Sequence, residues 1–328
     1  NELREEGLIA ESGLFASTGG RKAKAWSAVD DARLAFGMEI TANHISLVAV
    51  DLKARIRTSK RIRYTFSDNF FYYQTIGKFV REMIQETCVR PEQVLGLGVS
   101  IPAIITPDRR GITYCRAIPL PADLYDKLKR VIPCQIHLYN DAYSGGFAQW
   151  WDTNPQDART IVYLSLSNTV GGSMVHHGRL YTGNNLRSCE FGHMTLIPDG
   201  KPCFCGQRGC LNAYCSASVL SDMAGGKMSR FFSEVKEGNE PYLTAFRQYM
   251  QYLAIAVNSL RMSYDCDVVL GGYVGSYMAD FLPEFRQIVS RRNPFEQNAD
   301  YVSACRFTFE ASAMGSALRY TDAFISRI

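Results

Sequence analysis

One stretch of this 328-residue chain, CEFGHMTLIPDGKPCFCGQRGCLNAYCS at residues 189–216, is the most informative about fold and function. Cys203, Cys205 and Cys210 form a C-x-C-x4-C array, and His193 precedes the array with nine residues between them. Three thiolates and one imidazole make a closed tetrahedral zinc site. Glycines within the array let a short loop fold back on the ion without steric cost. The spacing therefore predicts a structural Zn²⁺ bound by His193, Cys203, Cys205 and Cys210.

The same cysteines allow two other interpretations. They could be free thiols of an intracellular protein that lie close together by chance, or two of them could form a disulfide. Cysteines flanked by glycine at this spacing are typical of metal loops. The chain has ten cysteines and shows no secretory segment, which indicates a reducing compartment and disfavours the disulfide.

His193 has a second possible use. A zinc-bound imidazole can present its other nitrogen to a ligand, because the metal fixes the tautomer and the orientation of the ring. Glu190 lies three residues earlier, close enough on a turn to point into the same space. We therefore predict that the zinc supports a small-molecule pocket.

The pattern E-x-G-H at 190–193, followed by C-x-C-G-x-x-G-C at 203–210, resembles the signature of the ROK family. This family contains sugar kinases and sugar-responsive transcriptional repressors. Its pattern continues with a sugar-binding glutamate, where this chain has Asn212. The resemblance implies an α/β, two-lobed, actin-like ATPase fold of the ribonuclease H-like type, and it places Asn212 among the sugar contacts.

The composition agrees with a large soluble protein. With 46% hydrophobic residues, the chain has enough apolar material for two sizeable cores. No apolar run reaches the roughly 18 residues that a membrane span needs, and no signal-peptide core opens the chain. The formal net charge of +4 is small for this length, so any contact with nucleic acid must be local. We expect a cytoplasmic protein without membrane contact.

The front of the chain is predicted to form a short helix and a hairpin. Residues 1–6 are polar and helix-forming, Gly7 is placed to end the helix, and an alternating run begins at Leu8. After a turn at 17–20, residues 22–29 return as a second strand.

The turn of this hairpin carries Gly19, Gly20, Arg21 and Lys22. Such a turn can contact a phosphate backbone or place arginine in a minor groove. The segment resembles the end of the winged helix-turn-helix of ROK repressors, which implies that residues 1–35 are the remnant of a DNA-binding domain and that these four residues contact DNA. Taken alone, the turn is also compatible with a solvated basic hairpin that has no partner.

The remainder of the chain alternates apolar strands with amphipathic helices. Residues 37–64 are predicted to form a three-stranded meander, and 69–88 a helix with one apolar face. This is the α/β arrangement expected of an actin-like lobe. The resemblance divides the chain into an N-terminal lobe, residues 36–155 plus 311–328, and a C-terminal lobe with the zinc loop, residues 156–310.

Three loops that hold ATP in sugar kinases of this fold are altered here. Glycines matter in such loops because only they leave room for a phosphate against the main chain. The loop at 39–43 (EITAN) lacks both family glycines, and the loop at 167–173 (SNTVGGS) keeps only its middle pair. In the turn at 271–273 the third glycine is Tyr273. We therefore expect no ATP binding.

On the sugar side of the predicted cleft, the residues match the family pattern more closely than the ATP loops do. A short strand ends in Asn140-Asp141 at the start of a helix, where aspartate can also serve as a helix cap. In ROK kinases this pair holds the catalytic base, so the resemblance implies that Asp141 would take a sugar hydroxyl proton and Asn140 would bind a neighbouring hydroxyl. Without ATP, the same carboxylate can still accept hydrogen bonds from a sugar.

These features favour a sugar-responsive transcriptional regulator, a repressor of carbohydrate metabolism genes with no catalytic residue. A monosaccharide or its derivative is expected to contact Asn140, Asp141, Glu190, His193 and Asn212. Its binding would change the spacing of two DNA-binding heads in a homodimer or tetramer on operator DNA. The alternative is an ATP-dependent sugar kinase with Asp141 as the base. A third hypothesis is a zinc-stabilised assembly domain without a ligand.

Overall fold

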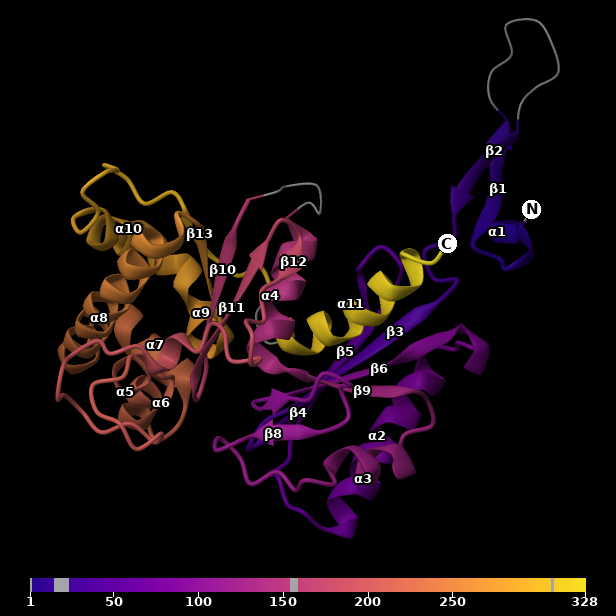
Figure 1. Cartoon of the computed structure of the whole chain (residues 1–328), viewed down its shortest axis with the longest axis horizontal. Helices are drawn as coiled ribbons and strands as arrows, with labels where there is room; N and C mark the ends of the chain where they lie inside the picture. The colour runs from indigo at the N-terminus through magenta and orange to yellow at the C-terminus, as the bar shows by residue number, and fades with distance from the viewer. Residues whose placement is uncertain (1, 15–23, 154–158, 308–309) are drawn as a thin grey trace, which may run out of the picture.

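The computed structural model describes residues 2–14, 24–153, 159–307 and 310–328. Figure 1 shows two sheets, each with its own helices, on either side of a central pair of helices. Within the described part of the chain, no helix is both long and apolar enough to cross a membrane.

The first sheet consists of five strands, β3 (Leu34–Ile40), β4 (His44–Val50), β5 (Ile56–Arg63), β6 (Val94–Ile101) and β9 (Ile136–Asn140). Their order is β5-β4-β3-β6-β9, in which β5, β4 and β3 are antiparallel and β6 and β9 run parallel to β3. The predicted three-stranded meander is confirmed. The predicted lobe boundary at residue 36 falls inside β3, because buried Leu34 and Ala35 already pair with β6.

The second sheet repeats this topology with β10 (Ile161–Leu166), β11 (Val170–His176), β12 (Arg179–Leu180), β13 (Asp267–Gly271) and β14 (Val302–Ala304). Its order is β12-β11-β10-β13-β14, with the same sequence of antiparallel and parallel pairs. The two lobes therefore share one fold pattern, although the sequence shows no internal repeat. We call them the first and second lobe, after their sheets.

Helices cover the outer face of each sheet. On the first lobe these are α2 (Phe70–Glu86) and α3 (Leu124–Val131), which enclose one apolar core with the sheet. On the second lobe a separate core lies under α5 (Asn212–Cys215), α6 (Ser218–Ser221), α7 (Met228–Lys236), α8 (Glu240–Tyr264), α9 (Gly272–Met278) and α10 (Leu282–Ser290).

At the centre of the molecule, two helices each follow the sheet of one lobe and pack on the sheet of the other. Helix α4 (Asp141–Asp152) follows β9 of the first sheet but packs on β10 and β11, whereas α11 (Ala311–Ile325) follows the second sheet and packs on β3 and β6. They also pack on each other (Figure 1). A third core, with residues such as Val48, Phe147, Tyr163 and Met314, joins both sheets through these helices.

Glycines make the contacts of α11 possible. A Cβ atom on Gly37 of β3 would lie 1.8 Å from the Ala313 carbonyl oxygen, and one on neighbouring Gly98 of β6 would lie 2.3 Å from the Ser316 carbonyl oxygen. On the opposite side, a Cβ on Gly315 would lie 1.7 Å from the carbonyl oxygen of Ser144 in α4. No side chain larger than hydrogen fits at these three positions, so the helix is fixed closely against the sheet and against α4.

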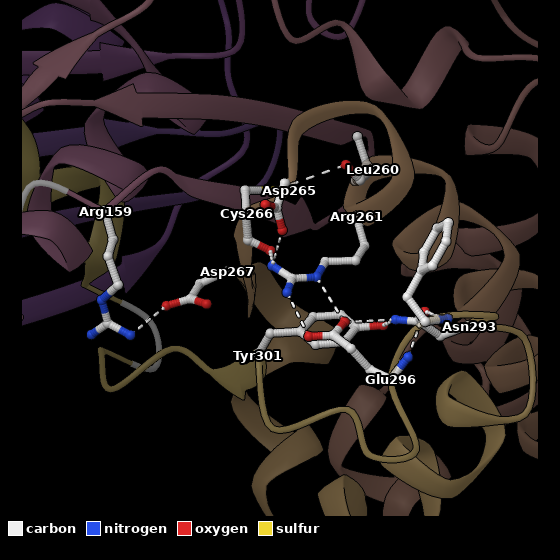
Figure 2. Close-up of polar contacts among 10 residues, drawn as sticks. Arg159, Leu260, Arg261, Asp265, Cys266, Asp267, Asn293, Glu296 and Tyr301 are labelled. Atoms are coloured by element: carbon white, nitrogen blue, oxygen red, sulfur yellow. Dashed lines mark hydrogen bonds and ion pairs between the residues drawn. The ribbon is translucent and has the colours of Figure 1, made fainter.

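Arg261 connects the end of α8 to the loop that precedes β14 through hydrogen bonds (Figure 2). Its Nε and Nη2 donate to the two carboxylate oxygens of Glu296 at 3.0 and 2.6 Å, and Nη1 donates to the Cys266 carbonyl oxygen. The guanidinium also lies 4.5 Å from the centre of the Tyr301 ring. Asn293 donates to Glu296 as well, so the second lobe has a closed polar network at its far end.

The front of the chain forms the predicted helix and hairpin. Short α1 (Glu2–Glu5) is followed by Gly7, whose φ of +69° favours glycine, and then by antiparallel strands β1 (Ile9–Leu14) and β2 (Lys24–Ala28). The hairpin projects from one end of the first lobe (Figure 1). Its predicted DNA contacts, Gly19, Gly20, Arg21 and Lys22, lie outside the described residues.

The close approach of α11 and α4 gives a first prediction. Alanine normally favours a helix over glycine by about 1 kcal/mol. Gly315→Ala should nevertheless lower the free energy of unfolding by about 1–3 kcal/mol, because its methyl group must displace the backbone of Ser144. Chemical denaturation measures the change, and Thr244→Ala on the exposed face of α8 serves as the control for helix propensity. Equal or raised stability in Gly315→Ala would contradict this packing.

Candidate functional site

The loop from 193 to 212 folds back on itself through backbone hydrogen bonds. The amide of Leu196 donates to the Gly209 carbonyl oxygen at 2.7 Å, and the amide of Gly209 donates to the Lys201 carbonyl oxygen at 2.8 Å. Gly209 has a φ of +79°, and a Cβ there would lie 1.8 Å from the Ile197 carbonyl oxygen. A glycine is therefore required where the two arms of the loop meet.

This fold brings together the four predicted metal ligands, His193, Cys203, Cys205 and Cys210. One ligand atom from each lies within 4.8 Å of all the others. The Sγ atoms of Cys205 and Cys210 are 3.8 Å apart, and Cys203 Sγ is 3.9 Å from His193 Nδ1. With zinc–sulfur bonds of about 2.3 Å, a tetrahedral site has sulfur–sulfur edges of about 3.8 Å. The donor set and its spacing therefore fit one zinc ion.

The imidazole of His193 connects this cluster to a cavity. Burial lowers the pKa of His193, which favours the neutral ring that binds metals. Because Nδ1 faces Cys203, a metal on that side leaves Nε2 for another partner. The ring packs edge-on against Phe204, and both residues line a small cavity of about 70 Å³.

The predicted ligand residues Asn140, Asp141, Glu190 and His193 all line this small cavity, which lies between the two lobes. The helix cap there is Asn140 and not Asp141, which corrects the sequence-based interpretation. Asn140 Oδ1 accepts from the Tyr143 amide at 2.9 Å, and its Nδ2 donates to the Ala103 carbonyl oxygen. Within the described part of the chain, the Asp141 carboxylate accepts a hydrogen bond from the neighbouring Ala142 amide at 2.8 Å, which leaves acceptor positions for a ligand.

Asn212, the fifth predicted ligand residue, has a different position. It is buried and lines an adjoining cavity of about 450 Å³ that also contains Asp141. Its Oδ1 accepts a hydrogen bond of 2.7 Å from the Val170 amide. A Cβ on Gly192 would lie 2.0 Å from the Val170 carbonyl oxygen, so the start of β11 is held from both sides. Asn212 thus positions the loop that precedes β11.

Glu39 is a cleft residue that the sequence analysis noted only as a remnant of a phosphate loop. Burial and the charge of Asp141 together raise the pKa of the Glu39 carboxyl to about 7, against the opposing charge of Arg61. Burial, with a smaller contribution from the charge of Glu190, raises the pKa of Asp141 to about 6. Two neighbouring carboxyl groups that titrate near neutral pH therefore lie in the cleft.

Two further residues that the sequence analysis did not assign to the site cross the cleft. The ring of Tyr273, from the second lobe, has its centre 5.4 Å from the Arg61 guanidinium of β5, and Tyr273 lines the same cavity as Thr41 of the first lobe. Arg116, from the first lobe, donates to the Cys205 carbonyl oxygen at 3.1 Å. No sequence signal marks these contacts, because each joins residues far apart in the chain.

The chain resembles known proteins in sequence and in fold. The model of the ROK family matches residues 35–322. An N-acetylmannosamine kinase of Salmonella arizonae is 31% identical over 188 residues, or 55% of this chain and 62% of that protein. The xylose repressor of Bacillus subtilis is 23% identical over 220 residues, or 67% of this chain and 57% of that protein. The chain thus spans about six tenths of the length of these curated relatives.

Solved structures show the same fold at low sequence identity. A ROK family glucokinase from Streptomyces griseus in complex with glucose and AMPPNP aligns with a TM-score of 0.72 and 18% identity, covering 87% of this chain and 98% of that one. A ROK family transcriptional regulator, a homologue of the E. coli MLC protein, aligns with a TM-score of 0.74 and 16% identity. That alignment covers 98% of this chain and 86% of that one.

The metal cluster gives a second prediction. The purified protein should hold about one zinc ion per chain, and Cys205→Ser should lose it and melt at a lower temperature, because structural zinc contributes directly to folding. Metal content by elemental analysis and melting by circular dichroism measure both effects. Cys88→Ser, which changes an exposed cysteine outside the cluster, is the matched control. A metal-free protein with unchanged melting would refute the zinc assignment.

A third prediction concerns the raised pKa of Glu39. The folded state holds this proton more tightly than the unfolded chain, so its stabilising effect is complete below the ordinary pKa of 4.5 and is lost as pH rises through about 7. Glu39→Gln removes the ionisation and should raise the free energy of unfolding at about pH 8 by at least about 1 kcal/mol. Denaturant titrations at about pH 5 and pH 8, with exposed Glu284→Gln as control, measure this. The idea fails if both variants keep the wild-type pH dependence.

Proposed function

Because this chain belongs to the ROK family, we propose that it is a DNA-binding transcriptional regulator whose cleft senses a monosaccharide or a sugar derivative. In this proposal residues 1–35, which include the hairpin, are the end of a winged DNA-binding domain. The first lobe follows as the N-terminal lobe, residues 36–155 plus 311–328, and the second lobe is the C-terminal lobe, residues 156–310. The regulator acts as a homodimer or tetramer on operator DNA.

The observation that carries the proposal is the hairpin in front of the two lobes. The family model begins at residue 35, and the glucokinase structure covers 87% of this chain. The regulator structure covers 98%, which leaves room for no more than a few of the hairpin residues outside the alignment. This difference in coverage supports a counterpart of the β1–β2 hairpin in the regulator, and the basic residues Arg21 and Lys22 in the sequence between its strands support a contact with DNA.

The cleft supports a sensor without ATP. In a kinase of this fold, the turn after β13 must leave room for a nucleotide. Here Tyr273 places its ring in the cleft, where it contacts Arg61 and Thr41 of the opposite lobe. A phosphate would have to displace this contact and would also meet side chains at Thr41 and Thr169 instead of glycine backbone.

The proposed sugar contacts are Asn140, Asp141, Glu190 and His193, with Asn212 at the adjoining cavity. Carboxylates, an amide and a neutral imidazole are suited to the hydroxyl groups of a sugar, since together they accept and donate hydrogen bonds. A zinc ion on the cysteines would contribute folding energy and fix the imidazole in one tautomer.

A sugar bound there would act on the angle between the lobes. Asn140 caps α4 and Asp141 is its first residue, whereas Glu190 and His193 belong to the second lobe. A ligand that contacts both pairs favours one lobe arrangement over another, and α4 transmits this preference to α11. Such differential binding is what couples a sugar to a distant DNA contact.

An ATP-dependent sugar kinase is the second candidate. A specific observation favours it: Asp141 keeps the position of a catalytic base in the cleft, and a sugar kinase is among the relatives at 31% identity. In that case Asp141 would accept a proton from the sugar hydroxyl.

The regulator hypothesis gives a fourth prediction. The natural full-length protein should bind a DNA site selected from a random pool, and a neutral hexose should change that affinity. Arg21→Ala with Lys22→Ala should weaken DNA binding and lower the slope of log affinity against log salt by about two, because two phosphate contacts are lost. Asp141→Asn should abolish the response to the sugar, measured as the ratio of DNA affinities with and without it. Filter binding at several salt concentrations provides the data.

The control is Lys129→Ala with Arg130→Ala, an exposed basic pair on α3 that changes the net charge equally. Loss of DNA affinity in this variant as well would indicate a non-specific charge effect. Phosphoryl transfer from ATP to a hexose at roughly 1 per second or more, abolished in Asp141→Asn, would replace the regulator with the kinase.

A further inference from the structure

A larger cavity of about 520 Å³ lies beside the small one, between α4, α11, the turn at 104–109 and the segment that begins at β12. This volume is typical of ligand pockets, which measure roughly 300–1,000 Å³. The two cavities share Asn140 and Glu190 as a common wall. Neither the proposed sugar contacts nor the metal cluster accounts for the rest of this larger cavity.

The lining of the larger cavity combines positive charge with aromatic surface. Arginines from three separate segments contribute to it, namely Arg109, Arg179 and Arg319, and they outnumber the two carboxylates, Glu190 and Asp322. The rings of Tyr143, Phe147 and Trp150 form much of the remaining wall. Guanidinium groups bind phosphate and carboxylate in a bidentate geometry, and aromatic walls suit the apolar faces of sugar rings.

Arg319 lies partly buried in the middle of α11, and its guanidinium lies 4.7 Å from the centre of the Phe147 ring. Burial lowers its pKa, Arg109 adds to this decrease, and Tyr139 and Asp322 oppose it. Among the described residues, no carboxylate oxygen lies within the 4.0 Å of an ion pair with its guanidinium. A desolvated cation without a paired anion is costly, so an anionic ligand would remove this cost.

Arg109 is held in the cavity by its backbone. Its φ of +61° is in the left-handed region, which costs a residue with a side chain about 1 kcal/mol or more. The conformation is kept because the Arg109 amide donates to Thr106 and its carbonyl oxygen accepts from Leu138, both at 2.9 Å. The Arg109 side chain also donates to the Tyr139 hydroxyl at 3.3 Å. The neighbouring strand β9 thus fixes this arginine beside Arg319.

Two residues of the wall carry buried polar atoms that lack a partner. Trp150 Nε1 and Ser144 Oγ make no hydrogen bond within the part of the chain that the structure describes. Both belong to α4, and their side chains are almost completely buried. Orphan polar atoms are rare in protein interiors and are usually satisfied by a ligand or by ordered water. Both residues line the cavity, but these two atoms are buried beneath its surface, so the arginines and not these atoms would contact a ligand.

We propose that the larger cavity is a second ligand site, for a sugar that carries a phosphate or a carboxylate group. Arg109, Arg179 and Arg319 bind the acidic group, and the aromatic residues of α4 contact the sugar ring. Because Arg179 comes from the second lobe and the other arginines from elements packed on the first, the ligand holds the two lobes together. It also alters the shared wall at Asn140 and Glu190, and so changes the affinity of the small cavity.

Titration calorimetry with the purified protein tests this proposal and is our fifth prediction. The probes are glucose 6-phosphate, N-acetylglucosamine 6-phosphate, glucuronate and inorganic phosphate, with glucose as the neutral comparison. At least one acidic sugar should bind ten-fold or more tightly than glucose, and inorganic phosphate should compete with it. Arg319→Gln and the more exposed Arg179→Gln should each weaken binding about ten-fold, since each loses a charge-assisted hydrogen bond. Arg247→Gln, an exposed arginine of α8, is the matched control.

The phosphate and carboxylate probes identify the preferred acidic group, and either preference supports the site. The proposal is overturned if none of the anions binds at millimolar concentration, or if binding is unaffected in both Arg319→Gln and Arg179→Gln.

The outcome is independent of the regulator hypothesis. A protein that binds a neutral hexose but no anion would overturn the second site and leave the sugar sensor in place. A protein that binds the anions but responds to no neutral hexose would do the reverse.

Discussion

The contact of α11 with the first sheet on one side and with α4 on the other is the constraint on which the rest of the molecule depends. Backbone atoms approach so closely there that only glycine fits at Gly37, Gly98 and Gly315. Because α4 and α11 each leave one lobe and pack on the other, they join two separate cores through a third. Any change in the angle between the lobes must therefore act through this helix pair.

The helix pair also determines where charged groups meet. Asn140, the last residue of β9, caps α4, which begins at Asp141, and both residues line the small cavity with Glu190 and His193. Farther along the same helices, the larger cavity gathers arginines from α11, β12 and the turn before β8 (Ile112–Tyr114). The two cavities differ in chemistry, since carboxyl groups dominate the first and guanidinium groups the second. They share a wall, which gives a physical route for one ligand to influence the other.

Two contacts cross the cleft between the lobes. Arg61 of the first lobe stacks on Tyr273 of the second, and Arg116 of the first lobe donates to Cys205 of the metal cluster. A ROK protein that has exchanged phosphate-binding glycines for such contacts keeps a two-lobed hinge and a polar cleft. These are the parts that a sensor needs, and they support the proposed function together with the hairpin at the front of the chain.

The sequence by itself determined the features that local spacing controls. The cysteine array, the meander, the hairpin and the Asn140-Asp141 junction each depend on residues close in the chain, so periodicity, turn glycines and ligand spacing were enough to locate them. Only the tertiary structure decided which distant groups meet. It made Asn140 the helix cap, assigned Asn212 to the loop before β11, set Glu39 beside Asp141 and gathered three arginines around an empty volume. Burial and the fields of distant charges arise from the packing of both lobes, and no local pattern in the chain records them.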